Sequence, residues 1–171
     1  MSRDILLVTG VSASGKDFLL GKARRFDERL GGAIPIVSMG SAIVAKTNQL
    51  AAAGQDSVDR DRIKHAVSND IMRNIVRSIV PDLAGYPATV LNGHITYRQQ
   101  GKLVSNPDID AEIDATAYAV VIANPQDIAE WRVSDSSRCR EAETVDEIAR
   151  HQDFTLQTAE RMATILGAGF A

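Results

Sequence analysis

Short apolar runs alternate with longer amphipathic stretches along the chain. Runs that are apolar on both faces are typical of buried parallel strands, and they occur at residues 5–8, 34–37, 88–91 and 118–123. Apolar residues at helical spacing, bounded by glycine or proline, predict helices at 16–30, 41–53, 59–79, 125–132 and 145–165. This alternation predicts an α/β fold: a mostly parallel sheet in a three-layer α/β/α arrangement.

The stretch 59–79 and the stretch 93–114 show opposite patterns. In the first, apolar residues recur at every fourth position before Pro81, as on one face of a long helix: Ile63, Val67, Ile71, Ile75 and Ile79. The second is polar and without periodicity, so it predicts an irregular connection with a turn at Gln99-Gln100-Gly101.

Composition excludes several classes of protein. A chain of 171 residues, 44% hydrophobic and 24% charged, has the size of one globular domain. The net charge is −3 and no block of Lys and Arg is present, which argues against a long nucleic-acid partner. The single cysteine, Cys139, excludes an intramolecular disulfide. Neither a signal peptide nor an apolar run of about 18 residues is present, so a cytoplasmic protein without a membrane partner is expected.

Residues 10–17 read Gly-Val-Ser-Ala-Ser-Gly-Lys-Asp between the first predicted strand and the first predicted helix. Two glycines five positions apart, followed by lysine, form the pattern of a phosphate-binding P-loop. The glycines let backbone N–H groups turn toward an anion, the helix N-terminus adds positive potential, and the lysine reaches the β- and γ-phosphates. The alternative is a glycine turn beside an unrelated lysine. The motif predicts a P-loop fold that binds ATP through Gly10, Ser12, Ala13, Ser14, Gly15, Lys16, Asp17 and Phe18.

The last position of the motif departs from the usual pattern. A Ser or Thr hydroxyl normally binds Mg²⁺ there, but this chain has Asp17. A carboxylate is also a hard oxygen donor, so Asp17 is a candidate Mg²⁺ ligand; the alternative is a carboxylate that only interacts with the helix dipole. A second departure is Asn92, at a strand end where an acid is often found. One hypothesis is that Asp17 supplies the charge that Asn92 lacks.

These features together resemble the archaeal-type adenylate kinases, which are P-loop nucleoside monophosphate kinases. The family tends to carry Asp-Thr-His where this chain has Asn92-Gly93-His94. The Gly-Lys-Asp ending of the loop is similar to that of phage-type deoxynucleotide monophosphate kinases and phosphomevalonate kinases. The likeness is collinear over nearly the whole chain and rests on Val8-Thr9-Gly10-Val11, Met39-Gly40-Ser41, Asp59-Arg60-Asp61, Asn92-Gly93-His94, Arg132, Asp135, Arg138, Arg140, Asp146-Glu147 and His151-Gln152.

The resemblance implies an acceptor-binding region at about 41–62 and a short lid at about 133–144. Arginine forks suit phosphate oxygens, so the implied catalytic residues besides Lys16 are Arg132, Arg138 and Arg140. The alternative for these arginines is pairing with Glu141, Glu143 and Asp146. The residues implied to bind the acceptor are Gly40, Ser41, Arg60, Asn92 and His94. For Arg60, the alternative is an ion pair with its acidic neighbours. For His94, the alternative is a purely structural role.

Three functions are open at this point. The favoured one is a nucleoside monophosphate kinase that uses ATP and Mg²⁺, with AMP or a deoxynucleoside monophosphate as the leading acceptor. An ionised phosphate needs no general base, whereas a hydroxyl acceptor usually does. The second is a kinase that phosphorylates a hydroxyl of a small metabolite or modified nucleoside, with Asp17 or His94 as base. The third is a non-catalytic ATP-binding regulator. The resemblance also allows a homo-oligomer.

Overall fold

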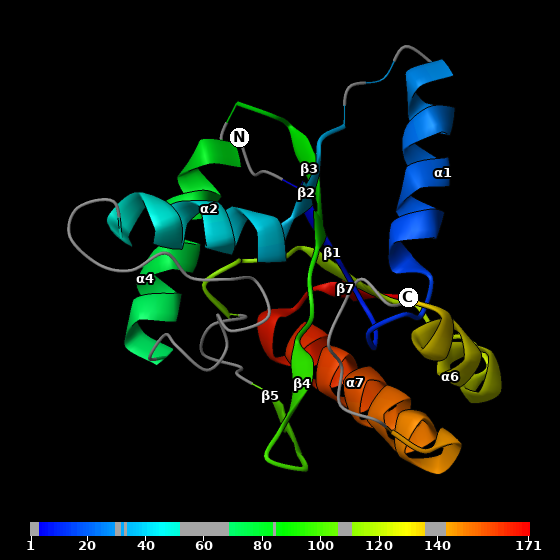
Figure 1. The fold of residues 1–171 in the computed structure, drawn as a ribbon. Coiled ribbons are helices and arrows are strands. Elements are labelled where there is room, and N and C mark those ends of the chain that lie inside the picture. The colour runs from blue at the N-terminus through cyan, green and yellow to red at the C-terminus, as the bar shows by residue number, and fades with distance from the viewer. Residues whose placement is uncertain are drawn as a thin grey trace.

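The computed structural model describes residues 4–29, 32, 34–51, 69–83, 85–105, 111–135 and 143–171 (Figure 1). The strands in these ranges are β1 (Asp4–Thr9), β2 (Ile36–Ser38), β3 (Ala88–Asn92), β4 (Thr96–Gln99), β5 (Lys102–Ser105), β6 (Ala117–Val120) and β7 (Gly169–Phe170). The helices are α1 (Lys16–Arg29), α2 (Met39–Ala51), α4 (Asn69–Ile79), the short 3-10 helix η1 (Val80–Leu83), α6 (Pro125–Ser134) and α7 (Val145–Leu166). Residues 59–68 of the expected long helix lie outside the described ranges.

Five strands form one parallel sheet in the order β2-β3-β1-β6-β7. The central strand is β1, in which Leu6 lies opposite Val90 of β3 and Ala117 of β6. The predicted α/β fold with a mostly parallel sheet is therefore confirmed. The edge strand β7 was not predicted, because a strand of two residues is too short to show an apolar period.

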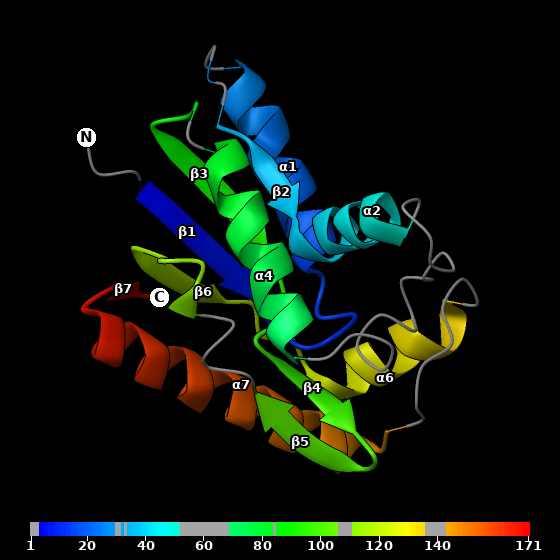
Figure 2. The ribbon, with the colours of Figure 1, turned by 90° about the vertical axis from the view of Figure 1, so that its left-hand side faces the viewer.

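Helices cover both faces of the sheet. In Figures 1 and 2, α1 lies on one side of the sheet, whereas α2 and α4 lie on the other. The main core forms where α4 and α7 meet the strands. There Ile75 and Val76 of α4 and Met162 of α7 pack with Leu91 and Tyr118, and none of the five is more than 3% exposed. This packing fixes the carboxyl ends of β1 and β3, from which the candidate site is built.

The segment after β3 forms an antiparallel hairpin of β4 and β5, so the expectation of an irregular connection there is wrong. The predicted turn is correct: Gln100 and Gly101 join the strands with φ angles of 51° and 75°. Two such residues in the left-handed region match the twist of a tight hairpin. The residue that this hairpin buries at its start is the polar Thr96, 3% exposed, so the hydrophobic pattern gave no signal.

Caps fix the ends of α6 and α7. The Asn124 side chain caps α6, and Pro125 occupies the first turn, where its missing N–H costs nothing. Thr144 and Glu147 form a reciprocal capping box at the start of α7. Gly167 ends α7 with a φ of 65°, a conformation that glycine adopts without a Cβ clash. These caps place the start of α7, and with it Glu143, at a defined position.

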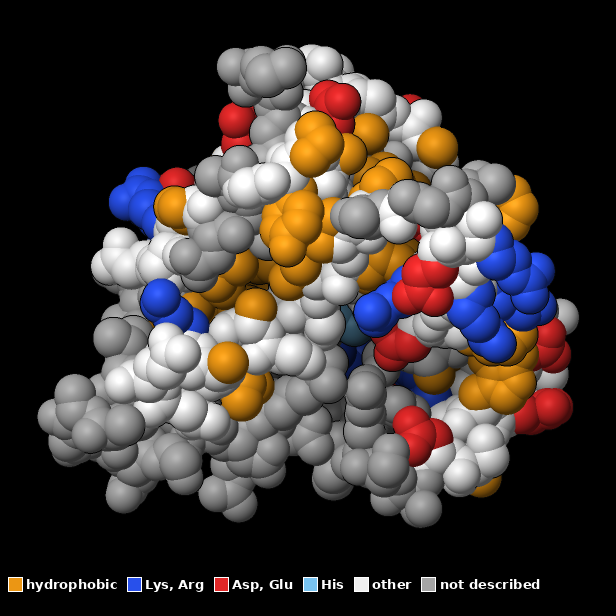
Figure 3. Space-filling view, turned by 90° about the horizontal axis from the view of Figure 1, so that it is seen from above, with side chains coloured by type: hydrophobic (Ala, Val, Ile, Leu, Met, Phe, Trp, Pro, Cys, Tyr) orange, Lys and Arg blue, Asp and Glu red, His pale blue; other side chains and the backbone are white. Residues whose placement is uncertain are grey.

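On the face seen in Figure 3, several Lys and Arg side chains gather at the right of the view, with Asp and Glu side chains at the edge of the group. No helix in the described part of the chain is long and apolar enough to cross a membrane.

Candidate active site

The predicted P-loop leaves the carboxyl end of the central strand β1 and leads directly into α1. Gly10 begins the loop with a φ of +152°, and a Cβ on it would lie 2.6 Å from the carbonyl oxygen of Val121 and 2.9 Å from the hydroxyl of Ser14. No other residue fits that space without moving the backbone. The first glycine of the motif is therefore required by close packing against the end of β6.

The rest of the loop has the geometry of an anion cradle. Ala13 and Gly15 both have positive φ angles, of 67° and 84°. Alternation of right- and left-handed residues turns successive backbone N–H groups toward one point. Ser14 between them is 3% exposed, and its hydroxyl has no hydrogen-bond partner among the described residues. A buried hydroxyl without a partner is costly, and a phosphate oxygen would satisfy it.

Lys16 and His94 meet at the carbonyl oxygen of Gly10. Lys16 is 6% exposed and donates from Nζ at 3.3 Å, and the Nδ1 atom of His94 lies 2.7 Å from the same oxygen. Because a carbonyl oxygen only accepts, Nδ1 carries a proton, and the Nε2 atom of the neutral ring is an acceptor. Both side chains lie at the carboxyl end of the sheet, where ligands bind in open parallel sheets.

The surroundings of His94 favour the neutral form of its ring. Enclosure by protein atoms, reinforced by the positive charge of Lys16, lowers the pKa of His94 to about 3. Part of the residue is nevertheless exposed to solvent, so the enclosure concerns mainly the ring edge near Gly10; a pKa lowered from 6.5 by any amount keeps the ring mostly uncharged at pH 7. A base with so low a pKa is poorly matched to removing a proton from a hydroxyl near neutral pH.

The two departures from the usual P-loop pattern contact each other. The Nδ2 atom of Asn92 donates to Oδ1 of Asp17 at 2.5 Å. A carboxylate only accepts, so the amide nitrogen must face it, and Oδ2 of Asp17 and Oδ1 of Asn92 are left for other partners. Within the described residues no group of three or more His, Cys, Asp or Glu side chains could hold a metal. Mg²⁺, however, uses one or two protein oxygens together with phosphates and water, and this pair fits that need.

The expected acceptor residues of α2 lie beside the end of β3. Gly40 and Ser41 belong to the first turn of α2, and Oγ of Ser38 accepts from the backbone N of Ser41 at 3.4 Å. Met39, which begins α2, is 5% exposed, and a Cβ on Gly93 would lie 3.5 Å from its Cγ. The structure thus brings α2 next to the segment that follows β3.

The other predicted site residues divide into two groups. Phe18 is 65% exposed on the outer surface of α1, with Nζ of Lys22 4.5 Å from its ring centroid, so only its backbone, in the first turn of α1, is near the loop. Arg60, Arg138, Arg140 and Cys139 lie outside the described residues, with residues 52–62 of the expected acceptor region and 136–142 of the expected lid.

Arg132 binds the P-loop itself. Its Nε and Nη2 atoms donate to the carbonyl oxygen of Ser12 at 3.2 and 3.1 Å, and Nη1 donates to Oε2 of Glu143. The alternative that Arg132 pairs with Glu143 is confirmed, although the pair is buried rather than solvated: the two side chains are 9% and 6% exposed.

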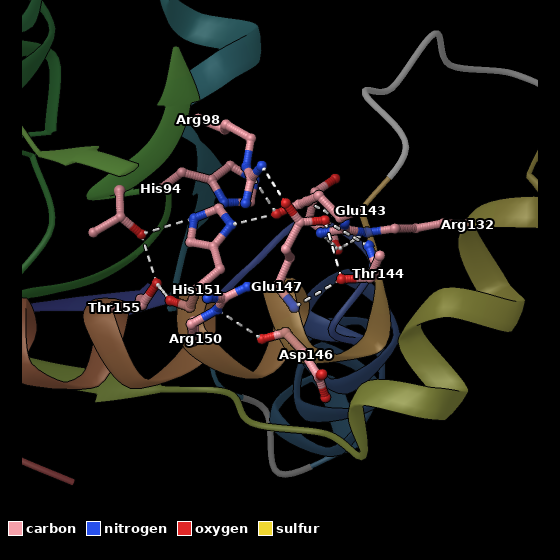
Figure 4. A network of polar contacts seen from close by, with 12 residues as sticks. His94, Arg98, Arg132, Glu143, Thr144, Asp146, Glu147, Arg150, His151 and Thr155 are labelled. Carbon is pink, nitrogen blue, oxygen red and sulfur yellow. Dashed lines mark hydrogen bonds and ion pairs between the residues drawn. The ribbon is translucent and has the colours of Figure 1, made fainter. Parts of the chain in front are cut away.

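Glu143 is the centre of a polar network that the sequence did not predict (Figure 4). Its Oε1 atom lies 3.3 Å from Nε of Arg98 and 3.5 Å from Nδ1 of His151, and Arg98 also binds Glu147 at 3.0 Å. Burial opposes ionisation, but the contacts with His151 and Arg132 prevail and lower the pKa of Glu143 to about 2. Two signals in the sequence pointed to this cluster: the alternative that Arg132 pairs with Glu143, and the resemblance at His151, which is buried within α7.

The low pKa of Glu143 predicts a defined loss of stability in acid. A carboxyl whose pKa falls from 4.5 to about 2 on folding stabilises the fold above pH 4.5, and this contribution is lost as the pH falls toward 2. The free energy of unfolding of wild type should therefore exceed that of Glu143→Gln by a constant amount near neutral pH, and the difference should shrink below about pH 4.5. Urea titrations from pH 7 to 2 measure it. A difference that is independent of pH would contradict the assignment.

Comparison with known proteins agrees with this geometry. Residues 9–149 match the family model AAA_17, described as an AAA domain. The chain belongs to this family. An adenylate kinase from Thermoplasma acidophilum is 24% identical over 166 residues, which cover 95% of this chain and 84% of the relative. Two solved structures have TM-scores of 0.54: shikimate kinase from Acinetobacter baumannii in complex with shikimate (11% identical, 99% of this chain and 82% of that chain) and TT1252 from Thermus thermophilus (13% identical, 99% and 87%).

The family and its relatives place the chain among adenylate-kinase-like P-loop kinases. At these low identities the solved structures bear on the fold alone, which is that of the P-loop kinases. Family membership supports an ATP-dependent kinase, and kinases of this type use ATP, typically with Mg²⁺. The names of the relatives cover both a nucleotide and a hydroxyl acid as acceptor, so the acceptor has to be inferred from the site.

Proposed function

We propose that this protein is a nucleoside monophosphate kinase, which converts ATP and a nucleoside monophosphate to ADP and a nucleoside diphosphate. The observation that carries the proposal is the geometry at the mouth of the P-loop, where Nδ1 of His94 lies 2.7 Å from the carbonyl oxygen of Gly10 and Oδ1 of Asp17 accepts from Asn92. The surroundings of His94 lower its pKa and weaken it as a base, and one oxygen of Asp17 is taken by the hydrogen bond from Asn92. A hydroxyl acceptor usually needs a strong general base beside it, whereas an ionised phosphate acceptor needs none. The likeness to an adenylate kinase supports the same acceptor class.

The residues of the P-loop would do most of the work in this reaction. An oxygen of the acceptor phosphate forms a bond to the γ-phosphorus as the bond to the β–γ bridging oxygen breaks, and ADP leaves with that electron pair. Lys16 would move from the carbonyl oxygen of Gly10 to the β- and γ-phosphate oxygens, where negative charge shifts during transfer. The Ser14 hydroxyl and the N–H groups of the cradle would hold the phosphates still.

The Asp17–Asn92 pair would hold the metal. Oδ2 of Asp17 and Oδ1 of Asn92 are hard oxygen donors at the mouth of the loop. Mg²⁺, when bound, neutralises negative charge on the β- and γ-phosphates. The carboxylate of Asp17 would hold the metal on the P-loop side, and the amide of Asn92 would keep that carboxylate in position.

The remaining expected residues complete the proposal. Gly40, Ser41, Asn92 and His94 would line the acceptor phosphate, at the junction of α2 and the segment after β3. The neutral Nε2 atom of His94 can accept a hydrogen bond there. We also propose that Arg60, Arg138 and Arg140 bind phosphate oxygens, with Arg138 and Arg140 on a segment that closes over ATP. Closure would exclude the water that otherwise hydrolyses ATP.

An acceptor panel tests the proposal. Formation of ADP should be fastest with a nucleoside monophosphate or deoxynucleoside monophosphate, and should fall to the rate without acceptor when shikimate, gluconate or a nucleoside is offered. The measurement is a coupled ADP-release assay, with identification of the nucleoside diphosphate by chromatography. A hydroxyl acceptor that turns over faster than every nucleotide would favour the second function, and ATP binding without turnover on any acceptor would favour the regulator.

A further inference from the structure

All three guanidinium nitrogens of Arg132 donate hydrogen bonds to other groups of the protein. A guanidinium carries five N–H bonds in a planar fork. Nε and Nη2 both donate to the carbonyl oxygen of Ser12, and Nη1 donates to Glu143. The side chain is only 9% exposed. An arginine in this position is poorly placed to clamp a transferring phosphoryl group, and well placed to fix whatever its two partners belong to.

One partner is the P-loop peptide that joins Ser12 to Ala13. In a trans peptide the carbonyl and the N–H point in opposite directions, so holding the oxygen of Ser12 also fixes the direction of the Ala13 N–H. Ala13 has a φ of 67°, which for a residue with a Cβ is held only where the surroundings require it. A cation on the carbonyl also polarises the peptide and makes its N–H a better donor to an anion.

The other partner, Glu143, is itself held from three elements. Oε2 accepts a hydrogen bond from Arg132 of α6, and Oε1 lies 3.3 Å from Nε of Arg98 on β4 and 3.5 Å from Nδ1 of His151 on α7 without accepting a hydrogen bond from either; all four side chains converge in Figure 4. The carboxylate immediately precedes the capped start of α7. The guanidinium of Arg132 thus binds a buried carboxylate that also lies within ion-pair distance of Arg98. Glu147, the next acid of the network, binds Arg98 and its own helix cap but not Arg132.

We infer that Glu143 and Arg132 form a P-loop brace, in which Glu143 holds Arg132 on the carbonyl oxygen of Ser12 and so sets the loop for binding the phosphates of a nucleotide. Both are positioning residues in this role. The inference rests on the proposed function only in that the loop binds ATP and ADP. A brace acts on the loop whatever nucleotide is present, whereas a clamp on the γ-phosphate acts only when that phosphate is there.

Binding of ADP and of ATP distinguishes the two roles. Dissociation constants are measured by isothermal titration calorimetry for wild type, Arg132→Lys, Glu143→Gln and the matched control Glu147→Gln. Lysine keeps the charge but lacks the planar fork that spans both acceptors. We expect Arg132→Lys and Glu143→Gln to raise the dissociation constants of ADP and ATP by the same factor, about tenfold or more. Residues that position the groups in direct contact with a ligand typically have effects of this size. Glu147→Gln should stay within about twofold, because a glutamine still completes the capping box.

Amide exchange of residues 10–15 gives a second readout that does not depend on affinity. In folded Glu143→Gln the loop should exchange faster than in wild type, while the middle of α7 stays unchanged. Unchanged ADP affinity together with unchanged loop exchange would overturn the brace, and so would ATP weakened without ADP, which would make Arg132 a phosphate clamp. These two experiments measure nucleotide binding and loop exchange, not turnover. A protein that binds ADP but phosphorylates no acceptor in the acceptor panel would therefore contradict the proposed function and leave the brace intact. A wild type that binds neither nucleotide would overturn both.

Discussion

Replacing Lys16 by alanine is expected to lower the turnover number by about 10²-fold or more, while the protein stays folded. In the structure the ammonium rests on the carbonyl oxygen of Gly10, at the edge of the cradle. It is the cation that the P-loop supplies to the β- and γ-phosphates, and its attraction grows as charge accumulates during transfer. The loss should therefore appear mainly in kcat, with a smaller change in KM for ATP. Steady-state kinetics with the best acceptor of the panel measure both.

Lys22→Ala is the matched control for Lys16→Ala. Lys22 lies six positions further along the chain on the same helix, where its Nζ contacts the exposed ring of Phe18 instead of the loop. Its loss should leave kcat within about twofold, since surface changes away from a site have small effects. Circular dichroism and thermal unfolding of both variants establish that they fold. Near-normal turnover in folded Lys16→Ala would remove the P-loop from the mechanism.

Asp17→Ala is expected to raise the Mg²⁺ concentration for half-maximal rate by about tenfold or more, because a charged oxygen donor is lost from the metal. Asp17→Ser, which restores the usual hydroxyl ligand, should recover part of the activity. Asn92→Asp should also be harmful on its own. Its new carboxylate would face that of Asp17 across the present 2.5 Å contact, and two like charges so close cannot both ionise freely.

The double variant Asp17→Ser/Asn92→Asp gives the sharpest form of this test. It moves the single negative charge from the P-loop to the strand end, which is the usual arrangement. The double variant should recover more activity than the two single losses would predict by addition, which is the signature of residues that act on one partner. Mn²⁺ binding in the presence of ADP, followed by electron paramagnetic resonance, reports the metal without turnover. Additive losses, with unchanged Mn²⁺ affinity in Asp17→Ala, would leave Asp17 as a helix-start carboxylate only.

Local patterns sufficed for the sheet and the loop. Buried parallel strands are apolar on both faces, so β1, β3 and β6 were found near their observed positions. The P-loop is recognisable because its glycines, its lysine and its place between strand and helix depend on the local backbone. Gly10 illustrates this: the structure adds that Val121 and Ser14 leave no room for a Cβ, but the motif had already required glycine.

The polar contacts were out of reach of such patterns. Asp17 and Asn92 are 75 positions apart, and Ser12 and Arg132 are 120 apart. A local sequence pattern does not distinguish a charged side chain that is exposed to solvent from one that is buried against a partner. Thr96 shows the same difficulty. It is buried, and its hydroxyl lies 2.5 Å from that of Thr155 on α7. Because threonine is polar, the hydrophobic pattern did not predict the strand that begins with it.

The amino-acid sequence by itself determined the α/β fold, the P-loop and the candidate cations and carboxylates of the site, because strand burial, helix period and loop glycines are set by residues close together in the chain. Only the tertiary structure decided which of those side chains meet. The parallel sheet brings Asn92 at the end of β3 to Asp17 at the start of α1. The packing of α6 against α7 turns Arg132 onto Ser12 and Glu143. Such pairings follow from the order of strands and the angles between helices, which no local pattern encodes.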